Sequence, residues 1–232
     1  MKIRFSYVLV ALVAISVMFG CKEPEHVVLD IHPYEVHPIP NKSKKEYRKI
    51  AEAIEQGSDA YYDVANSPIY QYFYSPTHSG CYDGKYSRVW ASSMGRYVCF
   101  TQNIHDRDIE TAWSEGAYRH GIGEFVVFEL PSTNPKIAGV NIVNGYAKSD
   151  KAWAENSRVR RLKVYFNDKE YAILNLEDSR SLQRFELGVL EDDPSVCGPT
   201  WQFKFEILDV YPGSRYTDTI ITEMFFDGFD AN

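Results

Sequence analysis

The sequence predicts an all-β fold, an antiparallel sandwich or jelly roll preceded by a short helical segment. In the run 158–166, RVRRLKVYF, apolar and charged side chains alternate, and the run 201–207, WQFKFEI, repeats the pattern. A period of two gives a strand one buried face and one solvated face. The other apolar or alternating runs, bounded by turn residues and read as strands, are 125–130, 137–143, 171–176, 182–187 and 220–226. Many short strands without intervening helices are typical of antiparallel two-layer folds.

One amphipathic helix is expected ahead of these strands. Ser43 and Glu46 have the spacing of a capping box, and Gly57 supplies a stop. The apolar residues between them, at helical spacing, are Tyr47, Ile50, Ala51 and Ile54. Together with the tyrosine-rich run that follows, this helix forms a preface over residues 43–79, and the sandwich is expected over residues 80–232.

The beginning of the chain has the features of a bacterial lipoprotein signal. Lys2 and Arg4 precede an apolar run at 8–19 that is too short to span a bilayer comfortably. The run ends in Met-Phe-Gly-Cys, which resembles a lipobox. We therefore expect a signal peptide over residues 1–20 and lipidation of Cys21. The protein would then be exported and held by its lipid at the bacterial cell envelope, on the periplasmic face or the cell surface.

A tether is expected to join this anchor to the folded part. Residues 21–42 contain four prolines and little periodicity. Beyond the tether, the cysteines are Cys81, Cys99 and Cys197. Cys81 and Cys99 flank one segment and are the pair we favour for a disulfide, with three buried thiols as the alternative.

The charge balance argues against nucleic acid as a partner. The chain has 25 Lys and Arg residues against 32 Asp and Glu, a net charge of −7 with His neutral. Removing the predicted signal removes two of the basic residues, whereas binding to a phosphate backbone needs a basic face. The local basic run at 158–163 alternates with apolar residues and is better read as the solvated face of a strand.

Three segments together resemble a known family. They are Asn103–Gly123, NIHDRDIETAWSEGAYRHGIG, followed by the strand EFVVFEL; Asn141–Lys163, NIVNGYAKSDKAWAENSRVRRLK; and Ile207–Phe225, ILDVYPGSRYTDTIITEMF. In order and spacing they resemble the discoidin-like (coagulation-factor type C) domain found beside bacterial NAD glycohydrolases, where it serves as a glycan-binding and translocation module. The resemblance implies a discoidin-like jelly roll and a non-catalytic role. It does not imply NAD hydrolysis, because the catalytic domain of those toxins is a separate unit.

The acidic turn that follows His105 is a candidate metal loop. Its sequence is similar to the D-G-[ND]-x-x-T-x-W loop of discoidin-like sugar-binding modules, in which a structural calcium is held together with a glutamate near the C-terminus. The resemblance implies Asp106, Asp108, Thr111 and Glu223 as ligands, and hard oxygen donors suit Ca²⁺. Arg107 stands where the family has glycine, a replacement that disfavours a positive φ. Its guanidinium offers an alternative to calcium, because it could neutralise Asp106 or Glu223.

Two loops at one end of the sandwich offer the chemistry of a sugar site. Such a site needs aromatic faces for the C–H side of a pyranose and planar polar groups for vicinal hydroxyls. The candidate contacts are Asn144, Tyr146, Trp153, Asn156 and Arg158 in the first loop, Tyr211, Arg215, Tyr216 and Asp218 in the second, and Glu115 just beyond the acidic turn. The alternative is that these residues cap the end of the sandwich and tie it with hydrogen bonds, and Trp113 is expected in the core.

The sequence favours a binding module over an enzyme. Glu115, Glu124 and Asp218, with His105 and His120, are candidate acids and bases, but no nucleophile-elbow, zincin or Cys/His/Asn pattern accompanies them. We expect a non-catalytic module for a glycan or envelope polysaccharide. A protein partner, gripped by the same aromatic loops, is the alternative, as in an envelope or translocation accessory lipoprotein.

Overall fold

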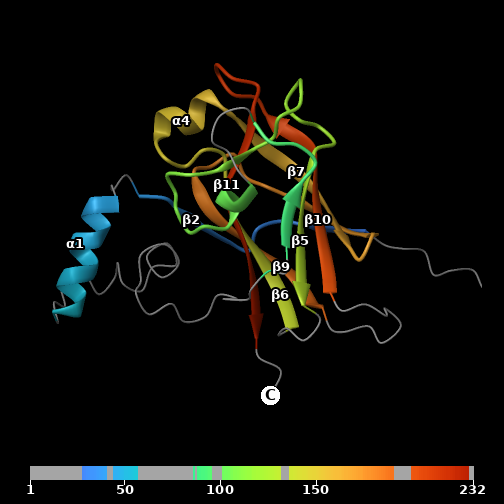
Figure 1. Cartoon of the computed structure of the whole chain (residues 1–232), viewed down its shortest axis with the longest axis horizontal. Helices are drawn as coiled ribbons and strands as arrows, with labels where there is room; N and C mark the ends of the chain where they lie inside the picture. Colours follow the sequence, from blue (N-terminus) through green and yellow to red (C-terminus); the bar gives the residue numbers. More distant parts are fainter. Residues whose placement is uncertain are drawn as a thin grey trace, which may run out of the picture.

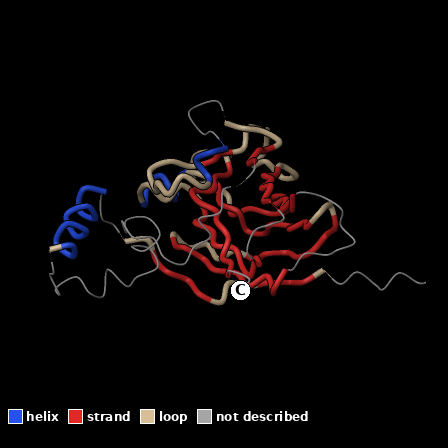
Figure 2. Tube along the Cα trace, turned by 60° about the horizontal axis from the view of Figure 1, so that its bottom comes forward, coloured by secondary structure: helices blue, strands red, loops and turns tan. Residues whose placement is uncertain are grey.

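The computed structural model describes residues 28–40, 44–56, 86, 88–95, 101–131, 136–190 and 200–229. Its strands are β1 (Leu29–Ile31), β2 (Glu35–Pro38), β3 (Arg88–Ala91), β4 (Trp113–Ser114), β5 (Phe125–Pro131), β6 (Lys136–Asn144), β7 (Ser157–Phe166), β8 (Lys169–Asn175), β9 (Ser181–Leu190), β10 (Thr200–Tyr211) and β11 (Thr219–Phe229). Helices α1 (Lys44–Glu55) and α4 (Asp150–Glu155) and the 3-10 helix η2 (Thr101–Ile104) complete the set. The predicted all-β class is confirmed, and Figure 2 shows strands making up the body of the molecule.

The strands form two layers that share one hydrogen-bonded sheet. One layer has the order β2-β9-β6-β11, and the other has the order β3-β5-β10-β7 with β8 on the far side of β7. Most neighbours are antiparallel, whereas the layers join where β11 runs parallel to β7 over two residue pairs, Thr219 with Ser157 and Ile220 with Arg158. This junction brings the start of β11 and the start of β7 to the same end of the sandwich (Figure 1).

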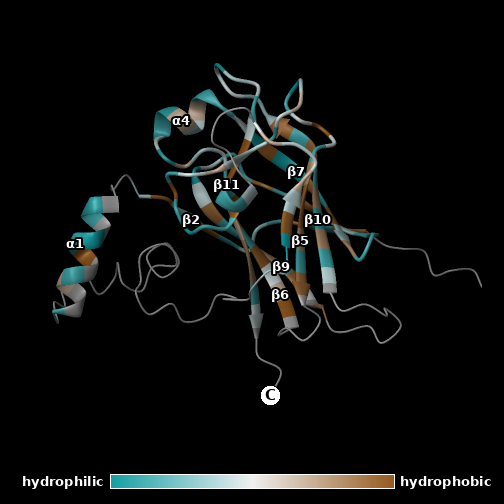
Figure 3. Cartoon of the chain, viewed as in Figure 1, coloured by the Kyte–Doolittle hydropathy of each residue, from teal (hydrophilic) through white to brown (hydrophobic). Residues whose placement is uncertain are grey.

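Aromatic side chains from both layers meet in the core. Phe226 on β11 lies 5.5 Å from Phe128 on β5 and 4.9 Å from Phe203 on β10, measured between ring centroids. All three rings are fully buried. The Phe128–Phe226 pair is edge-to-face, an arrangement that contributes beyond the area that the rings bury. The alternation that predicted the strands is visible as changing hydropathy along them in Figure 3.

The strand predictions after residue 120 are all confirmed by β5 to β11, and α1 confirms the predicted helix. α4 was not expected, and it lies inside the segment that we predicted as a loop. No helix in the described ranges combines the length and apolar character needed to cross a bilayer.

The prediction of a tether over residues 21–42 is corrected for residues 28–40. Leu29–Ile31 pairs in parallel with β8, and Glu35–Pro38 pairs antiparallel with β9. These two strands lie on the sandwich and extend its edges. Pro38 is tolerated because it is the last residue of a strand at the edge of the sheet.

Several predictions fall on residues outside the described ranges. They are the signal peptide over 1–20, the lipidation of Cys21, the tyrosine-rich part of the preface up to residue 79, and the pairing of Cys81 with Cys99. These stay predictions. Trp113, in contrast, is described, and its burial in the core confirms the expectation.

Candidate functional site

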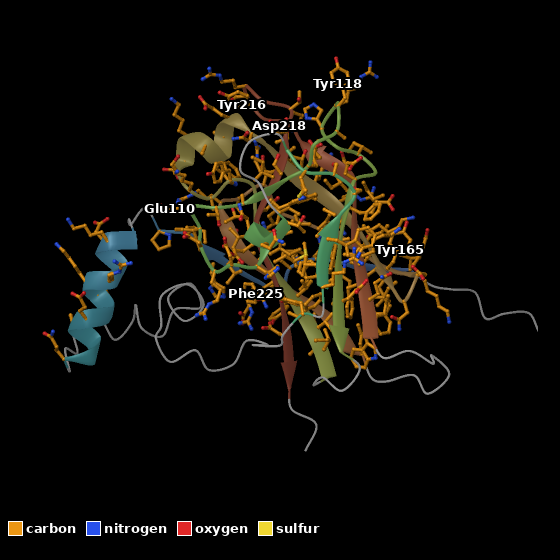
Figure 4. The ribbon with its side chains drawn as sticks, in the orientation of Figure 1. Glu110, Tyr118, Tyr165, Tyr216, Asp218 and Phe225 are labelled. Carbon is orange, nitrogen blue, oxygen red and sulfur yellow. The ribbon has the colours of Figure 1, made fainter. Side chains whose placement is uncertain are left out.

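Three loops meet at the end of the sandwich where the two layers join. They are residues 115–124 between β4 and β5, residues 145–156 with α4 between β6 and β7, and residues 212–218 between β10 and β11. We call this region the loop end. Figure 4 shows Tyr118, Tyr216 and Asp218 there, at the extremity of the molecule opposite the C-terminus.

The buried hydroxyl of Ser157 ties the first and third loops together. Its Oγ lies 2.9 Å from Nδ1 of His120, accepts a hydrogen bond from the Gly213 amide at 3.1 Å and donates to the Tyr216 carbonyl at 3.3 Å. The hydroxyl of Thr219 adds a bond of 2.8 Å to the His120 carbonyl. Because these donors and acceptors are removed from water, the two loops are held at fixed positions relative to one another.

Glu115 is a structural brace of this end, which corrects our expectation that it contacts a ligand. The side chain is 1% exposed, and its carboxylate accepts from the amides of Thr219 at 3.0 Å and Ala117 at 2.6 Å. Burial raises the pKa of this carboxyl, and the two amide bonds act against that rise. Each carboxylate oxygen therefore accepts a hydrogen bond from a backbone amide of the loop end, and neither faces the surface.

Arg158 braces the second loop in the same way. Its guanidinium binds Asp178 through two hydrogen bonds of 3.0 and 2.9 Å, donates to the Asn156 carbonyl at 3.0 Å and lies 4.4 Å from the centre of the Trp153 ring. The ring in turn donates from Nε1 to the Asn144 carbonyl at 3.2 Å. The planar guanidinium of arginine can both form a bidentate pair with a carboxylate and stack on an aromatic ring, and Arg158 does both.

Three of the predicted ligand contacts in this loop are therefore corrected. Asn144 is fully buried and exchanges two hydrogen bonds with the backbone of Val159, at 2.7 and 2.9 Å. Asn156 is 9% exposed and donates to the Ala152 carbonyl, and Arg158 is 7% exposed. Their polar groups are satisfied inside the protein, as the capping alternative predicted.

Two predicted tyrosines also have their hydroxyls occupied. Tyr146 donates to the Glu110 carbonyl at 3.0 Å, and Tyr211 donates to the Leu176 carbonyl at 3.1 Å. Both side chains are half-buried, as is Trp153. Their polar atoms hold neighbouring segments of the chain.

The exposed members of the predicted set are Arg215, Tyr216 and Asp218. Tyr216 is 40% exposed, and the guanidinium of Arg215 lies 5.0 Å from the centre of its ring. Arg215 also lies 3.6 Å from the Glu155 carboxylate, while its side chain stays 61% exposed. Within the predicted set of sugar contacts, only these three residues are exposed, and together they offer an aromatic ring, a positive charge and a negative charge.

Sequence reasoning missed Tyr118 and Arg119 on the neighbouring loop. Tyr118 is 89% exposed, and the Arg119 guanidinium lies 5.7 Å from its ring centre. Arg119, His120 and Gly121 have φ of 69°, 65° and 61°, three consecutive residues in the left-handed region. This conformation is unfavourable for the two residues that carry a Cβ, and such strain persists only where surrounding contacts over-determine it. The position of Tyr118 in a loop between Gly116 and Gly121 is the feature of the sequence that could have indicated this pair.

The acidic turn is brought together with Glu223, as predicted. The Asp108 amide donates to Glu223 at 3.0 Å and to Asp106 at 2.9 Å, and the Thr111 hydroxyl donates to Asp106 at 2.7 Å. Arg107 has φ of 62°, so the positive φ of the family's glycine is kept despite the side chain. The donor atoms suit a hard cation, yet these oxygens already accept from the turn itself. No group of three His, Cys, Asp or Glu within the described ranges is arranged to hold a metal ion, and a structural calcium and a metal-free, hydrogen-bonded turn stay the two alternatives.

Two layers joined at a loop end with these three segments define a discoidin-like β-sandwich. The chain belongs to the family of the NAD glycohydrolase translocation F5/8 type C domain, whose model matches residues 80–227. The resemblance inferred from the three sequence segments is therefore confirmed. Comparison with curated proteins finds no match.

One solved structure shares the fold, and a further structure gives a weaker match. The CBM32-1 and CBM32-2 domains of ZmpB from Clostridium perfringens are similar to this chain with a TM-score of 0.50 at 12% identity, over 90% of this chain and 43% of that one. The family 32 CBM of NanJ from the same organism, solved with galactose, gives a TM-score of 0.41 at 13% identity, over 60% of this chain and 91% of that one. The chain thus spans less than half the length of the ZmpB structure.

Proposed function

We propose that this protein is a non-catalytic carbohydrate-binding module that takes its ligand at the loop end. The observation that carries the proposal is the pair of exposed tyrosines, Tyr118 and Tyr216, each with an arginine over its ring and each on a loop braced by Ser157. Rigid aromatic anchors on a fixed frame lose little conformational entropy on binding.

The surrounding groups suit hydroxyl recognition. A tyrosine face accepts the apolar C–H side of a pyranose, and Arg215 and Asp218 offer planar donors and acceptors for vicinal hydroxyls. Asp218 lies between Tyr118 and Tyr216 in the view of Figure 4. Glu115, Asn144 and Arg158 act behind this surface, where they hold the loops that carry it.

Family membership and the fold support the same function. The family is described by a translocation domain of NAD glycohydrolases, and the ZmpB domains of similar fold are carbohydrate-binding modules of family 32. We further propose that the chain is exported and lipid-anchored through Cys21 at the bacterial cell envelope. A tethered module gains avidity from a surface that carries many copies of its ligand.

A glycan array tests the proposal, using the full chain in a detergent without a sugar headgroup. We expect binding to a subset of glycans, with affinity lowered roughly tenfold or more, about 1.4 kcal/mol, by Tyr118→Ala or Tyr216→Ala. Tyr165→Ala is the matched control, because Tyr165 lies on β7 away from the loop end (Figure 4). Glycan binding that both loop variants leave unchanged contradicts this site.

A protein partner is the second candidate. The observation that favours it is apolar exposure on and beside the loop that carries Tyr118: Ile122, in the same loop, is 54% exposed, and Met94, whose backbone lies against Gly116, is 52% exposed. Competition separates the two functions: soluble oligosaccharides displace a glycan from the loop end but leave a protein interface intact.

A further inference from the structure

A second hollow lies on the outer face of the β9-β6-β11 layer, away from the loop end. It has a volume of about 280 Å³ and is lined by Tyr34, Ala138, Gly139, Glu186 and Asp227. Asp227 stands eight residues along β11 from Thr219, the residue that marks the loop end. At the rise of a strand, this separation is roughly 26 Å, so the hollow cannot be part of the loop-end site.

The register of three strands builds the floor and the two sides of the hollow. Gly139 on β6 pairs with Glu186 on β9 and with Asp227 on β11, so a carboxylate stands on each side of a residue without a side chain. A Cβ at Gly139 would lie 2.7 Å from the Phe185 carbonyl oxygen. A side chain at this position would collide with the backbone of β9, so glycine is required, and no side chain covers the floor between the two acids.

Tyr34 supplies an aromatic wall, and Arg184 holds it in place. Tyr34 is 53% exposed, and the Arg184 guanidinium lies 5.8 Å from the centre of its ring. The same guanidinium donates to Asp227 at 3.1 Å and to Glu35 at 2.9 Å, while its Nε is buried and has no hydrogen-bond partner. The wall and one carboxylate are thus fixed before a ligand arrives.

The chemistry of the lining restricts the ligand. Carboxylates accept hydrogen bonds and do not donate. The side chain of Glu186 makes no hydrogen bond or ion pair with any other residue of the described ranges. Glu186 and Asp227 line the hollow, whereas Glu35 stands outside the lining and is bonded to both Arg184 and His37. With two lining carboxylates and Arg184 as their cationic neighbour, the site disfavours an anion. A ligand here must be rich in donors, neutral or positive, and must have an apolar face for Tyr34.

We propose that this hollow is a second saccharide-binding site, which takes one neutral or ammonium-bearing pyranose. Vicinal hydroxyls or an ammonium group donate to Glu186 and Asp227, and the ring lies against Tyr34 over the open floor at Gly139. The volume is at the small end of ligand sites, which matches one sugar ring rather than a long chain. The inference stands on its own geometry and does not require the loop-end site.

Calorimetric titration of the full chain in a detergent without a sugar headgroup tests the proposal. The background variant Tyr118→Ala/Tyr216→Ala removes the proposed loop-end contacts, and galactose, glucosamine and glucuronate are the probes. We expect residual binding of galactose or glucosamine to this background and no binding of glucuronate. Adding Tyr34→Ala or Glu186→Gln should weaken that residual binding at least tenfold.

Glu170→Gln, a surface carboxylate on β8, is the control and should leave the residual binding unchanged. Glu186→Gln is the decisive variant because its side chain is exposed and its loss leaves the packing intact. Absence of residual binding, or residual binding that Glu186→Gln and Tyr34→Ala leave unchanged, overturns the second site. If the wild-type protein binds sugar and the background variant does not, the loop-end proposal survives alone. If the background binds as tightly as wild type, the loop-end proposal fails, and the second site is upheld only where Glu186→Gln or Tyr34→Ala weakens that binding.

Discussion

The guanidinium of Arg158 on β7 lies 4.4 Å from the centre of the Trp153 ring on α4, and this contact fastens the helix to the strand. Asp178 fixes the outer side of the same guanidinium. The stack therefore joins three separate stretches of chain beneath the proposed glycan surface. Residues that look like ligand contacts by type act here as the frame of the site.

Arg158→Lys should destabilise the protein by about 2 kcal/mol. Lysine keeps the charge but loses the bidentate bond to Asp178 and the planar stack on Trp153, and the partners of a buried charge are left poorly satisfied. Urea unfolding measures the change. Arg160→Lys is the control, because Arg160 pairs with Asp209 at the surface, and we expect a change within about 0.5 kcal/mol. Equal effects of the two substitutions would show that the stack adds nothing.

Gly145→Ala should cost more stability than Gly123→Ala. Both glycines have positive φ, 74° and 89°, so both substitutions carry a backbone cost of about 1–2 kcal/mol. A Cβ at Gly145 would lie 2.5 Å from Cγ of Arg158 and 2.7 Å from Cδ1 of Trp153, whereas a Cβ at Gly123 meets nothing within 4 Å. Thermal unfolding should rank the two variants, with the tryptophan fluorescence of Gly145→Ala also altered. A Gly145→Ala protein as stable as Gly123→Ala is the opposing result.

The sandwich could be predicted because its strands are long enough to show a period of two. β7 and β10 are ten and twelve residues long, and β10 alternates buried with half-buried residues from Trp201 to Ile207. β1 and β2 have three and four residues and each pairs with one neighbouring strand, so they are too short to show a periodic signal. A proline-rich composition was read there as a tether, although Pro38 only ends its strand.

The site could be predicted at the level of loops but not of individual contacts. Residue type indicates that Asn144 and Arg158 are polar, and polar residues are mostly exposed. Their burial depends on Val159 and Asp178, partners that the sequence does not identify. Tyr118 precedes a left-handed turn at Arg119 and His120. Arginine and histidine rarely adopt a positive φ, so the sequence does not predict this turn.

Glu115 should make stability depend on pH in the acidic range. Its pKa in the folded protein is raised by burial, so the protonated form is favoured on folding. The resulting stability is fully present below the ordinary glutamate value of 4.5 and is lost as pH rises through the raised pKa. The free energy of unfolding of the wild type minus that of Glu115→Gln should therefore increase as pH falls from neutral toward 4.5.

The contributions of other titrating groups cancel when the two free energies of unfolding are subtracted. His105, whose pKa burial lowers, has the opposite effect as pH falls below 6.5, but it is present in both proteins and cancels in the difference. Glu110→Gln, at an exposed position, controls for the loss of one surface charge. A difference that stays flat, or that decreases toward pH 4.5, contradicts the role of Glu115 as a buried brace.

The acidic turn should keep its stability when metal is removed. Asp106 accepts from the Asp108 amide and the Thr111 hydroxyl, and Glu223 accepts from the same Asp108 amide, so the turn closes through its own hydrogen bonds. We expect the melting temperature to be the same with EDTA and with millimolar CaCl₂, and Glu223→Gln to lower it in both. A bound calcium would instead stabilise the folded state by about 2.7 kcal/mol at a hundred times its Kd. A rise in melting temperature with CaCl₂ that Asp106→Asn or Glu223→Gln abolishes would establish the predicted metal site and show that Arg107 does not replace it.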